Sequence, residues 1–98
     1  MSLSKFGFIV TGAGLDPRQH RVEMKSPAFT MIAVGVARAE QGVEVARTLA
    51  AEGVQLIELC GGFGPVWTAR VIEAVAPIPV GAVGYGPEAI DAMHALFS

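Results

Sequence analysis

The sequence predicts an α/β fold: a small, open, three-layer arrangement around a mainly parallel, four-stranded sheet of βα units. Three observations lead to this prediction. Short, almost continuously apolar runs rich in Val and Ile recur along the 98 residues, as is typical of parallel strands covered on both faces. Segments with apolar residues at helical spacing lie between these runs. The turn Gly62-Phe63-Gly64-Pro65 recurs 22 residues later as Gly84-Tyr85-Gly86-Pro87, each time between an apolar run and a helical segment.

Four segments have the composition of buried strands, namely residues 6–10, 29–36, 54–59 and 80–83. The strands are expected to be parallel and joined by right-handed crossovers, and parallel strands have their carboxyl ends at the same edge of the sheet. The glycine-rich bends that follow the first, third and fourth strands are therefore expected to gather at one edge.

Helices are predicted over residues 40–52, 65–76 and 87–97. The first is followed by Gly53, where a left-handed cap belongs. The other two begin with Pro65 and Pro87, and proline is favoured at the first helical position.

Residues 16–24 leave two interpretations open. Asp16 could cap a short helix that Pro17 begins. If these residues are not helical, the first strand is expected to pair antiparallel, and the fold becomes α+β.

Composition indicates a single domain over residues 1–98 that associates with copies of itself. Hydrophobic residues make up 52% of the chain and charged residues only 16%, against roughly 25% charged in ordinary domains. Apolar surface should therefore remain after folding, and a homo-oligomer would cover it.

Charge and segment length exclude other classes of partner. The net charge is −2 and no basic run is present, so neither nucleic acid nor a membrane surface is an expected partner. The longest apolar runs are too short to cross a membrane, and the first residues lack the pattern of a signal peptide. One cysteine cannot form an internal disulfide, so a cytoplasmic location is expected.

The densest chemical signal is the stretch Glu58-Leu59-Cys60-Gly61-Gly62-Phe63-Gly64-Pro65. Its glycines allow backbone N–H groups to approach a ligand closely, and the N-terminus of a helix follows. We therefore expect a small anionic metabolite at this edge, although a tight strand-to-helix turn would need the same glycines. The expected ligand-binding residues are Gly12, Gly14, Arg18, Gly61, Gly62, Phe63, Gly64, Tyr85 and Gly86.

A small enzyme is the alternative function, with Glu58, Cys60 and His20 as candidate catalytic residues. Glu58 interrupts an apolar strand, and a buried carboxylate has a raised pKa that suits an acid or base unless an arginine pairs with it. Cys60 could be a nucleophile with His20 as its base, or simply a small buried hydrophobe. One cysteine and two separated histidines give no metal-ligand spacing, and the sequence leaves any cofactor unknown.

A third alternative is a structural or regulatory oligomer without a ligand, in which Phe63 and Tyr85 close the glycine-rich edge. These residues are the aromatic positions of the two repeated turns. Their side chains could wall a pocket or fill the end of the sheet.

Residues 54–65 resemble the signature of a family of short bacterial proteins of unknown function. The segments Asp16-Pro17-Arg18-Gln19-His20-Arg21 and Val34-Gly35-Val36 also look similar to that family. The resemblance covers nearly the whole chain and implies a free-standing single-domain protein. It implies no activity, so the three functional hypotheses stay open.

Overall fold

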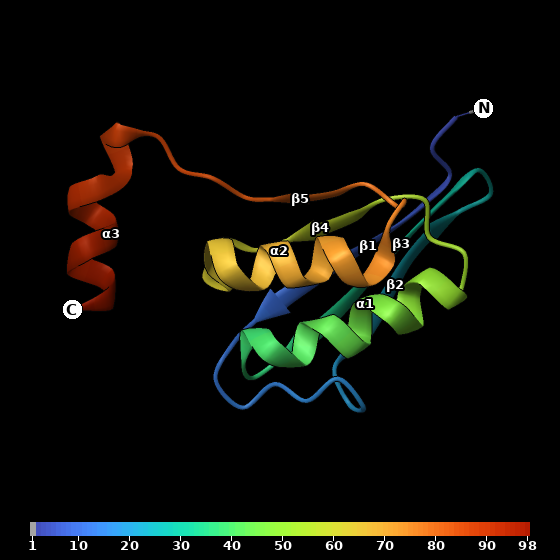
Figure 1. The fold of residues 1–98 in the computed structure, drawn as a ribbon, viewed down its shortest axis with the longest axis horizontal. Helices are drawn as coiled ribbons and strands as arrows, with labels where there is room; N and C mark the ends of the chain where they lie inside the picture. Colours follow the sequence, from blue (N-terminus) through green and yellow to red (C-terminus); the bar gives the residue numbers. More distant parts are fainter. Residues whose placement is uncertain (1) are drawn as a thin grey trace.

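The computed structural model describes residues 2–98 and contains one five-stranded sheet in the order β2-β3-β1-β4-β5 (Figure 1). The strands are β1 (Lys5–Thr11), β2 (Arg21–Ser26), β3 (Phe29–Val36), β4 (Ile57–Leu59) and β5 (Val80–Ala82). β1 lies in the centre and is parallel to both of its neighbours, β3 and β4, and β5 is parallel to β4. The predicted α/β class and the open, mainly parallel sheet are confirmed.

The sheet has a fifth strand, β2, in the region where the sequence allows a short helix over residues 16–24. β2 pairs antiparallel with β3, and the helix considered for residues 16–24 is absent. The Asp16 carboxylate accepts the backbone N–H of Arg18 at 2.9 Å, which makes a turn that leads into the strand. Residues 21–25 alternate between polar and apolar side chains, the pattern of a half-exposed strand. The antiparallel strand is thus β2, and the expected antiparallel pairing of the first strand is wrong.

Two helices, α1 (Gly42–Ala51) and α2 (Gly64–Val75), pack against each other on one face of the sheet (Figure 1). The crossover from β3 to β4 and the crossover from β4 to β5 step across the sheet in the same direction. Two right-handed crossovers that step in the same direction place their helices on the same face. The body therefore has two layers, whereas the sequence predicts three.

The core lies between this helical layer and the sheet. Its strand residues are Ile9, Ile32, Val34, Val36, Ile57 and Leu59, and its other members include Ala46, Leu49, Phe63, Val71 and Val75. Helix α1 lies close against β1, since a Cβ atom at Gly7 would lie 2.8 Å from Cδ1 of Leu49. Gly53 has a φ of +93° and follows α1, as its predicted role as a left-handed cap requires.

The opposite face of the sheet has no helical cover and carries apolar side chains. Val22 and Met24 on β2 are 65% and 66% exposed. The rings of Phe6 and Phe29 pair there, with centroids 5.6 Å apart. Side chains on each strand alternate between this face and the core, so the buried residues of β1 and β4 are two positions apart.

The last helix, α3 (Ile90–Phe97), stands apart from the body (Figure 1). It follows the short 3-10 helix η3 (Pro87–Ala89), and none of its residues is buried. Two further 3-10 helices, η1 (Ala39–Gln41) and η2 (Gly61–Phe63), lead into α1 and α2. Within residues 2–98, every helix is too short or too polar to cross a membrane.

Candidate functional site

The glycine-rich bends lie together at one edge of the sheet, as the sequence predicts. The strands β1, β3, β4 and β5 run in the same direction, so their carboxyl ends share this edge. A Cβ atom at Gly61 would lie 3.1 Å from Cε2 of Tyr85, so the two repeated turns touch. The backbone N–H of Thr11, at the end of β1, donates to Sγ of Cys60 at 3.2 Å.

Several of these glycines allow close packing within the protein. A Cβ atom at Gly62 would collide with Oγ1 of Thr11, and one at Gly12 would lie 2.8 Å from Cδ1 of Leu15. At Gly86 a Cβ atom would meet the Glu88 carboxylate. The space beside these backbones is therefore filled by side chains of the same chain.

Gly14 and Gly64 are needed for their backbone conformation. Their φ angles are +79° and +69°, and a Cβ atom at either position would have no neighbour within 4 Å. Only glycine adopts this region freely, so these two residues shape the turns that follow β1 and precede α2.

The two aromatic residues of the repeated turns have different environments. Phe63 is 3% exposed, and its ring lies where a Cβ atom of Gly42 would be. Phe63 thus belongs to the core and joins the starts of α1 and α2. Tyr85 is 61% exposed and lies over Gly61.

The three candidate catalytic residues do not come together. The half-buried Cys60 thiol contacts Oγ1 of Thr11 at 3.2 Å, while Nδ1 of His20 accepts the backbone N–H of Asp16 at 2.8 Å. Glu58 is exposed, and among residues 2–98 it has no ion-pair partner. The expectation that Glu58 is a buried carboxylate is wrong, because its face of the sheet has no helical layer. Within the same residues, no group of three or more His, Cys, Asp or Glu could hold a metal ion.

A cavity of about 450 Å³ lies between α1 and the segment that enters β2. Neither Glu58 nor Cys60 lines it. Its lining residues are Pro17, Arg18, Arg21, Val34, Gln41, Glu44, Val45, Thr48 and Leu49. The floor is apolar, with Val34 at 3% and Leu49 at 0% exposure. Of the residues singled out from the sequence as ligand-binding, only Arg18 lines this cavity.

The α1 side of the cavity has a sequence signal that went unused. Gln41, Glu44, Val45 and Thr48 repeat at the three- and four-residue spacing of one helix face. This face lies beside the core stripe that contains Ala46 and Leu49. The cavity forms because β2 extends the sheet beyond the reach of α1, and β2 is not among the strands that the sequence predicts.

One end of the cavity is fixed by an ion pair. Arg21 donates through Nη1 and Nη2 to both Glu52 carboxylate oxygens, at 2.8 and 2.5 Å. Glu52 raises the pKa of Arg21, and Arg21 holds the pKa of Glu52 below its usual value. A carboxylate of Glu23 also lies 3.7 Å from Arg21. The charge of Arg21 is thus already balanced.

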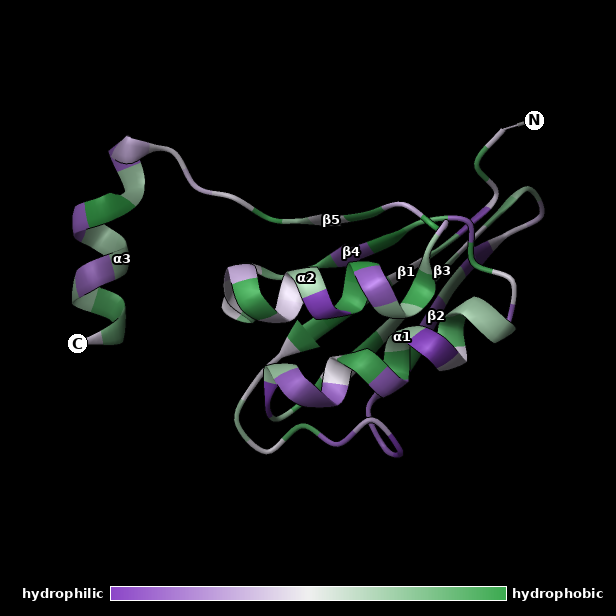
Figure 2. Cartoon of the chain, viewed as in Figure 1, coloured by the Kyte–Doolittle hydropathy of each residue, from purple (hydrophilic) through white to green (hydrophobic). Residues whose placement is uncertain are grey.

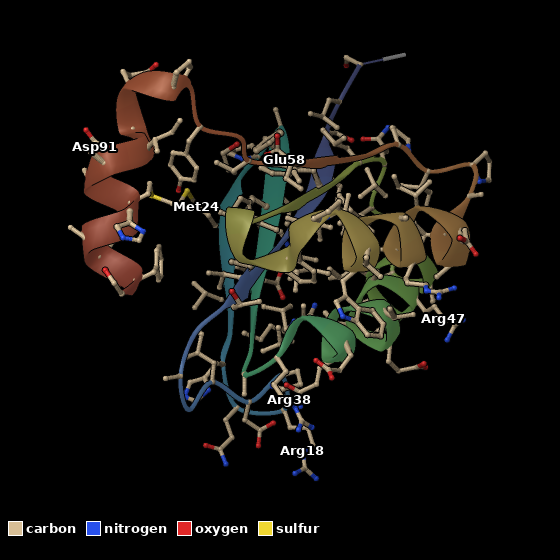
Figure 3. The ribbon with its side chains drawn as sticks, turned by 60° about the vertical axis from the view of Figure 1, so that its left-hand side comes forward. Arg18, Met24, Arg38, Arg47, Glu58 and Asp91 are labelled. Atoms are coloured by element: carbon tan, nitrogen blue, oxygen red, sulfur yellow. The ribbon has the colours of Figure 1, made fainter. Side chains whose placement is uncertain are left out.

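Arg18 stands at the mouth of the cavity with its charge available. Its side chain is 89% exposed, and its Nε lies 3.6 Å from Oδ1 of Asp16. The backbone N–H of Arg18 lowers the pKa of the Asp16 carboxyl by donating to it. Arg38 lies at the same end of the molecule as Arg18 (Figure 3). Two arginines therefore lie at this end of the molecule, with the Asp16 carboxylate beside Arg18 and Glu44 in the cavity lining.

A second cavity of about 340 Å³ lies on the uncovered face of the sheet. Its lining residues are Val10, Leu15, Gln19, His20, Arg21, Val22, Ala33, Val34 and Gly35. A Cβ atom at Gly35 would lie 2.8 Å from Cδ1 of Leu15, so Leu15 closes one end of this cavity.

A family model described as a family of unknown function (DUF6506) matches residues 4–98. No curated protein and no solved structure matches the chain. The match spans all five strands and the three α-helices.

Proposed function

We propose a ligand-binding function for this chain, which belongs to the family of unknown function DUF6506. The ligand is a small molecule with an apolar body and an anionic group, such as an aromatic or branched-chain carboxylate. The site is the cavity between α1 and β2. The observation that carries the proposal is an apolar cavity of about 450 Å³ with an exposed arginine at its mouth.

The size and lining of the cavity support this function. Small-molecule sites occupy roughly 300–1,000 Å³ and are mostly apolar, with a few polar groups that orient the ligand. Here Val34, Val45 and Leu49 would contact the apolar body. The hydroxyl of Thr48 donates to the backbone carbonyl of Glu44 at 3.2 Å, so its oxygen still has acceptor capacity toward a ligand.

The distribution of charge favours an anionic ligand over a cationic one. Glu44 is paired with Arg47 at 3.1 Å, and Glu52 is paired with Arg21. Arg18 is held only by the longer contact with Asp16. A guanidinium binds a carboxylate through two parallel hydrogen bonds, and Arg18 can reorient because nothing packs around its exposed end.

The enzyme alternative has less support. Glu58, Cys60 and His20 have separate surroundings, so a nucleophile and its base are not paired. The binding function needs no such pairing, and it retains Arg18 from the residues that the sequence indicates.

The test measures the binding of phenylacetate, 3-methylbutanoate and the neutral phenylacetamide by calorimetry and by thermal shift. We expect the carboxylates to bind and phenylacetamide to bind more weakly. Arg18→Ala should weaken carboxylate binding about 5- to 10-fold, the effect of one exposed charge-assisted contact, and should leave the amide unchanged. Val45→Trp should abolish binding of all three by filling the cavity.

Arg70→Ala is the matched control, because Arg70 is an exposed arginine on α2, away from the cavity lining. It should bind as the unmodified protein does. Binding that persists in Val45→Trp, or equal loss in Arg18→Ala and Arg70→Ala, would place the ligand elsewhere. Absence of binding by every probe would remove the proposal for this ligand class.

A further inference from the structure

The C-terminal arm, residues 83–98 after β5, carries an apolar stripe that is largely exposed. Ile90, Leu96 and Phe97 of α3 are 63%, 72% and 76% exposed, and Tyr85 in the preceding linker is 61% exposed. At 100° per residue, Ile90, Met93, Leu96 and Phe97 share one side of the helix, and Asp91, His94 and Ser98 share the other. Figure 2 shows hydrophobic bands on a helix that stands apart from the body.

An isolated helix of this length is not stable by itself. Helices shorter than about 12–15 residues are marginal in water and depend on packing of their apolar face. α3 has only eight residues. A surface that covers its stripe is therefore required for the helix to persist.

The uncovered face of the sheet lacks what α3 would provide. Val22, Met24 and Phe29 are exposed there. The register places Val22 beside Ala33 and Ala33 beside Phe8, so these three side chains form an apolar row across β2, β3 and β1. The cavity of about 340 Å³ lies over part of this row and is large enough to receive an aromatic ring.

The direction of the arm carries α3 away from its own sheet. Residues 83–86 continue beyond the end of β5, an edge strand. The molecule extends 40 Å along its longest axis, on which α3 lies at one end, and 28 Å along the other two (Figure 1). The apolar row is on β2, β3 and β1, whereas the arm leaves from β5 at the opposite side of the sheet.

We propose that α3 of each chain packs on the uncovered sheet face of a second copy, so that two chains exchange their C-terminal arms around a two-fold axis. One copy supplies a helix without cover and the other a face without a helix, and the exchange satisfies both at once. Phe97 and Leu96 enter the cavity beside Val22 and Ala33. Such an exchange closes as a dimer and leaves no free partner surface for further growth.

The surface involved is sufficient for a stable dimer. An aromatic side chain buries about 150–250 Å², and each arm carries the aromatic side chains of Tyr85 and Phe97 as well as those of Ile90, Met93 and Leu96. Two arms with the two faces that receive them would bury on the order of 1,600 Å², the size of a standard specific interface.

The test is sedimentation velocity at micromolar concentration on the whole chain and three variants. The unmodified protein should have a mass near twice 10.2 kDa. Phe97→Asp should weaken dimerisation about 100-fold or more, because one charge is placed in each of two apolar contacts. Val22→Asp should do the same from the receiving side. Val66→Asp is the matched control: Val66 on α2 is 61% exposed, close to the 65% of Val22, but lies on the helical side of the molecule.

Mixing two variants distinguishes exchange between copies from docking within one chain. Phe97→Asp keeps a functional face, and Val22→Asp keeps a functional arm. The mixed dimer therefore has one intact contact, whereas the dimer of either variant alone has none, so an equimolar mixture should associate more tightly than each variant by itself. A monomeric unmodified protein, equal loss in Val66→Asp and Val22→Asp, or a mixture that associates no more tightly than each variant by itself would each overturn the proposal. Circular dichroism on each variant shows whether it has folded, and the mixture remains decisive because both of its components keep their core residues.

Discussion

Substitution of Gly42 by alanine should destabilise the protein even though it lies inside a helix. Gly42 is the first residue of α1 and has a helical backbone, with φ −65° and ψ −24°. A Cβ atom there would collide with Cε2 of Phe63 and lie 2.7 Å from its Cζ. Phe63 is 3% exposed, so its ring has little room to move.

Two effects of opposite sign decide the magnitude. Alanine is favoured over glycine in a helix by about 1 kcal/mol. Overpacking of a filled core costs about 1–3 kcal/mol. The collision involves a rigid ring instead of the flexible end of a long side chain, so we expect the larger part of that range. The net loss should be about 1–2 kcal/mol, or roughly 4–10 °C in Tm for a domain of this size.

The assay is urea unfolding of four proteins: the unmodified chain, Gly42→Ala, Phe63→Leu and the double variant. Leucine lacks the Cε2 and Cζ atoms that collide, so Gly42→Ala should cost little or even stabilise in the Phe63→Leu background. Phe63→Leu itself should cost about 1–1.5 kcal/mol, and the coupling between the two sites should be about 1–2 kcal/mol. Equal effects of Gly42→Ala in both backgrounds would refute the reasoning, as would a gain in stability in the unmodified chain.

Three further predictions concern charge, backbone and thiol. Glu52→Gln should lower the free energy of unfolding by about 0.5–1 kcal/mol at neutral pH, a small value because Arg21 and Glu52 are each about one-third exposed. Because the pKa of Glu52 in the folded protein is lowered, this difference should fade as the pH falls through that pKa, below the ordinary 4.5. Unfolding measured against pH tests this, and a difference that is constant down to pH 2 would contradict it. Gly14→Ala should lower the free energy of unfolding by about 1 kcal/mol, because Gly14 has a φ of +79°. Gly81 has open space and an ordinary backbone, so Gly81→Ala should change the same free energy by no more than about 0.5 kcal/mol. Equal losses in the two variants would contradict the role of the backbone conformation. Alkylation of Cys60 by iodoacetamide should be at least 10-fold slower in the folded protein than in urea, because its half-buried thiol contacts the end of β1. Equal rates would show that the thiol is freely accessible.

The parallel strands were predictable because each one leaves a local pattern. The apolar run over residues 29–36 coincides with β3, and the glycine–proline pairs mark the starts of α2 and η3. The common edge of the bends follows from parallel pairing alone. These properties belong to single segments or to neighbouring ones, so they can be read along the chain.

The uncovered face was not predictable in the same way. Every residue of β1 except Lys5 and Thr11 is apolar or glycine, so the sequence predicts a strand that is covered on both faces, with Phe6 and Phe8 buried. Their cover depends on which side the helices take, and that is set by the order of the strands. No local pattern in the sequence predicts this order. Glu58 was misplaced for the same reason, since a carboxylate on the core face would have been costly and one on an open face is not.

The cavity between α1 and β2 depends on a strand whose alternating pattern was overlooked. Arg21 and Glu23 face the helical side, and Val22 and Met24 face the open side. With β2 in place, Arg21 lies within reach of Glu52, which is 31 residues away in the sequence. Arg18 is predicted as a ligand contact from its charge and from its position after the first bend, and it lines this cavity.

The central position of β1 has a consequence for folding kinetics. β1 is the first strand of the chain but lies between β3 and β4, so neither of its edges is paired until residues 29–36 and 57–59 have been added. The β3–α1–β4 segment cannot form its two strands as direct neighbours, because β1 must enter between them. Contacts of long sequence separation slow folding, and we expect a single rate-limiting step in which β1 inserts while α1 closes over Gly7.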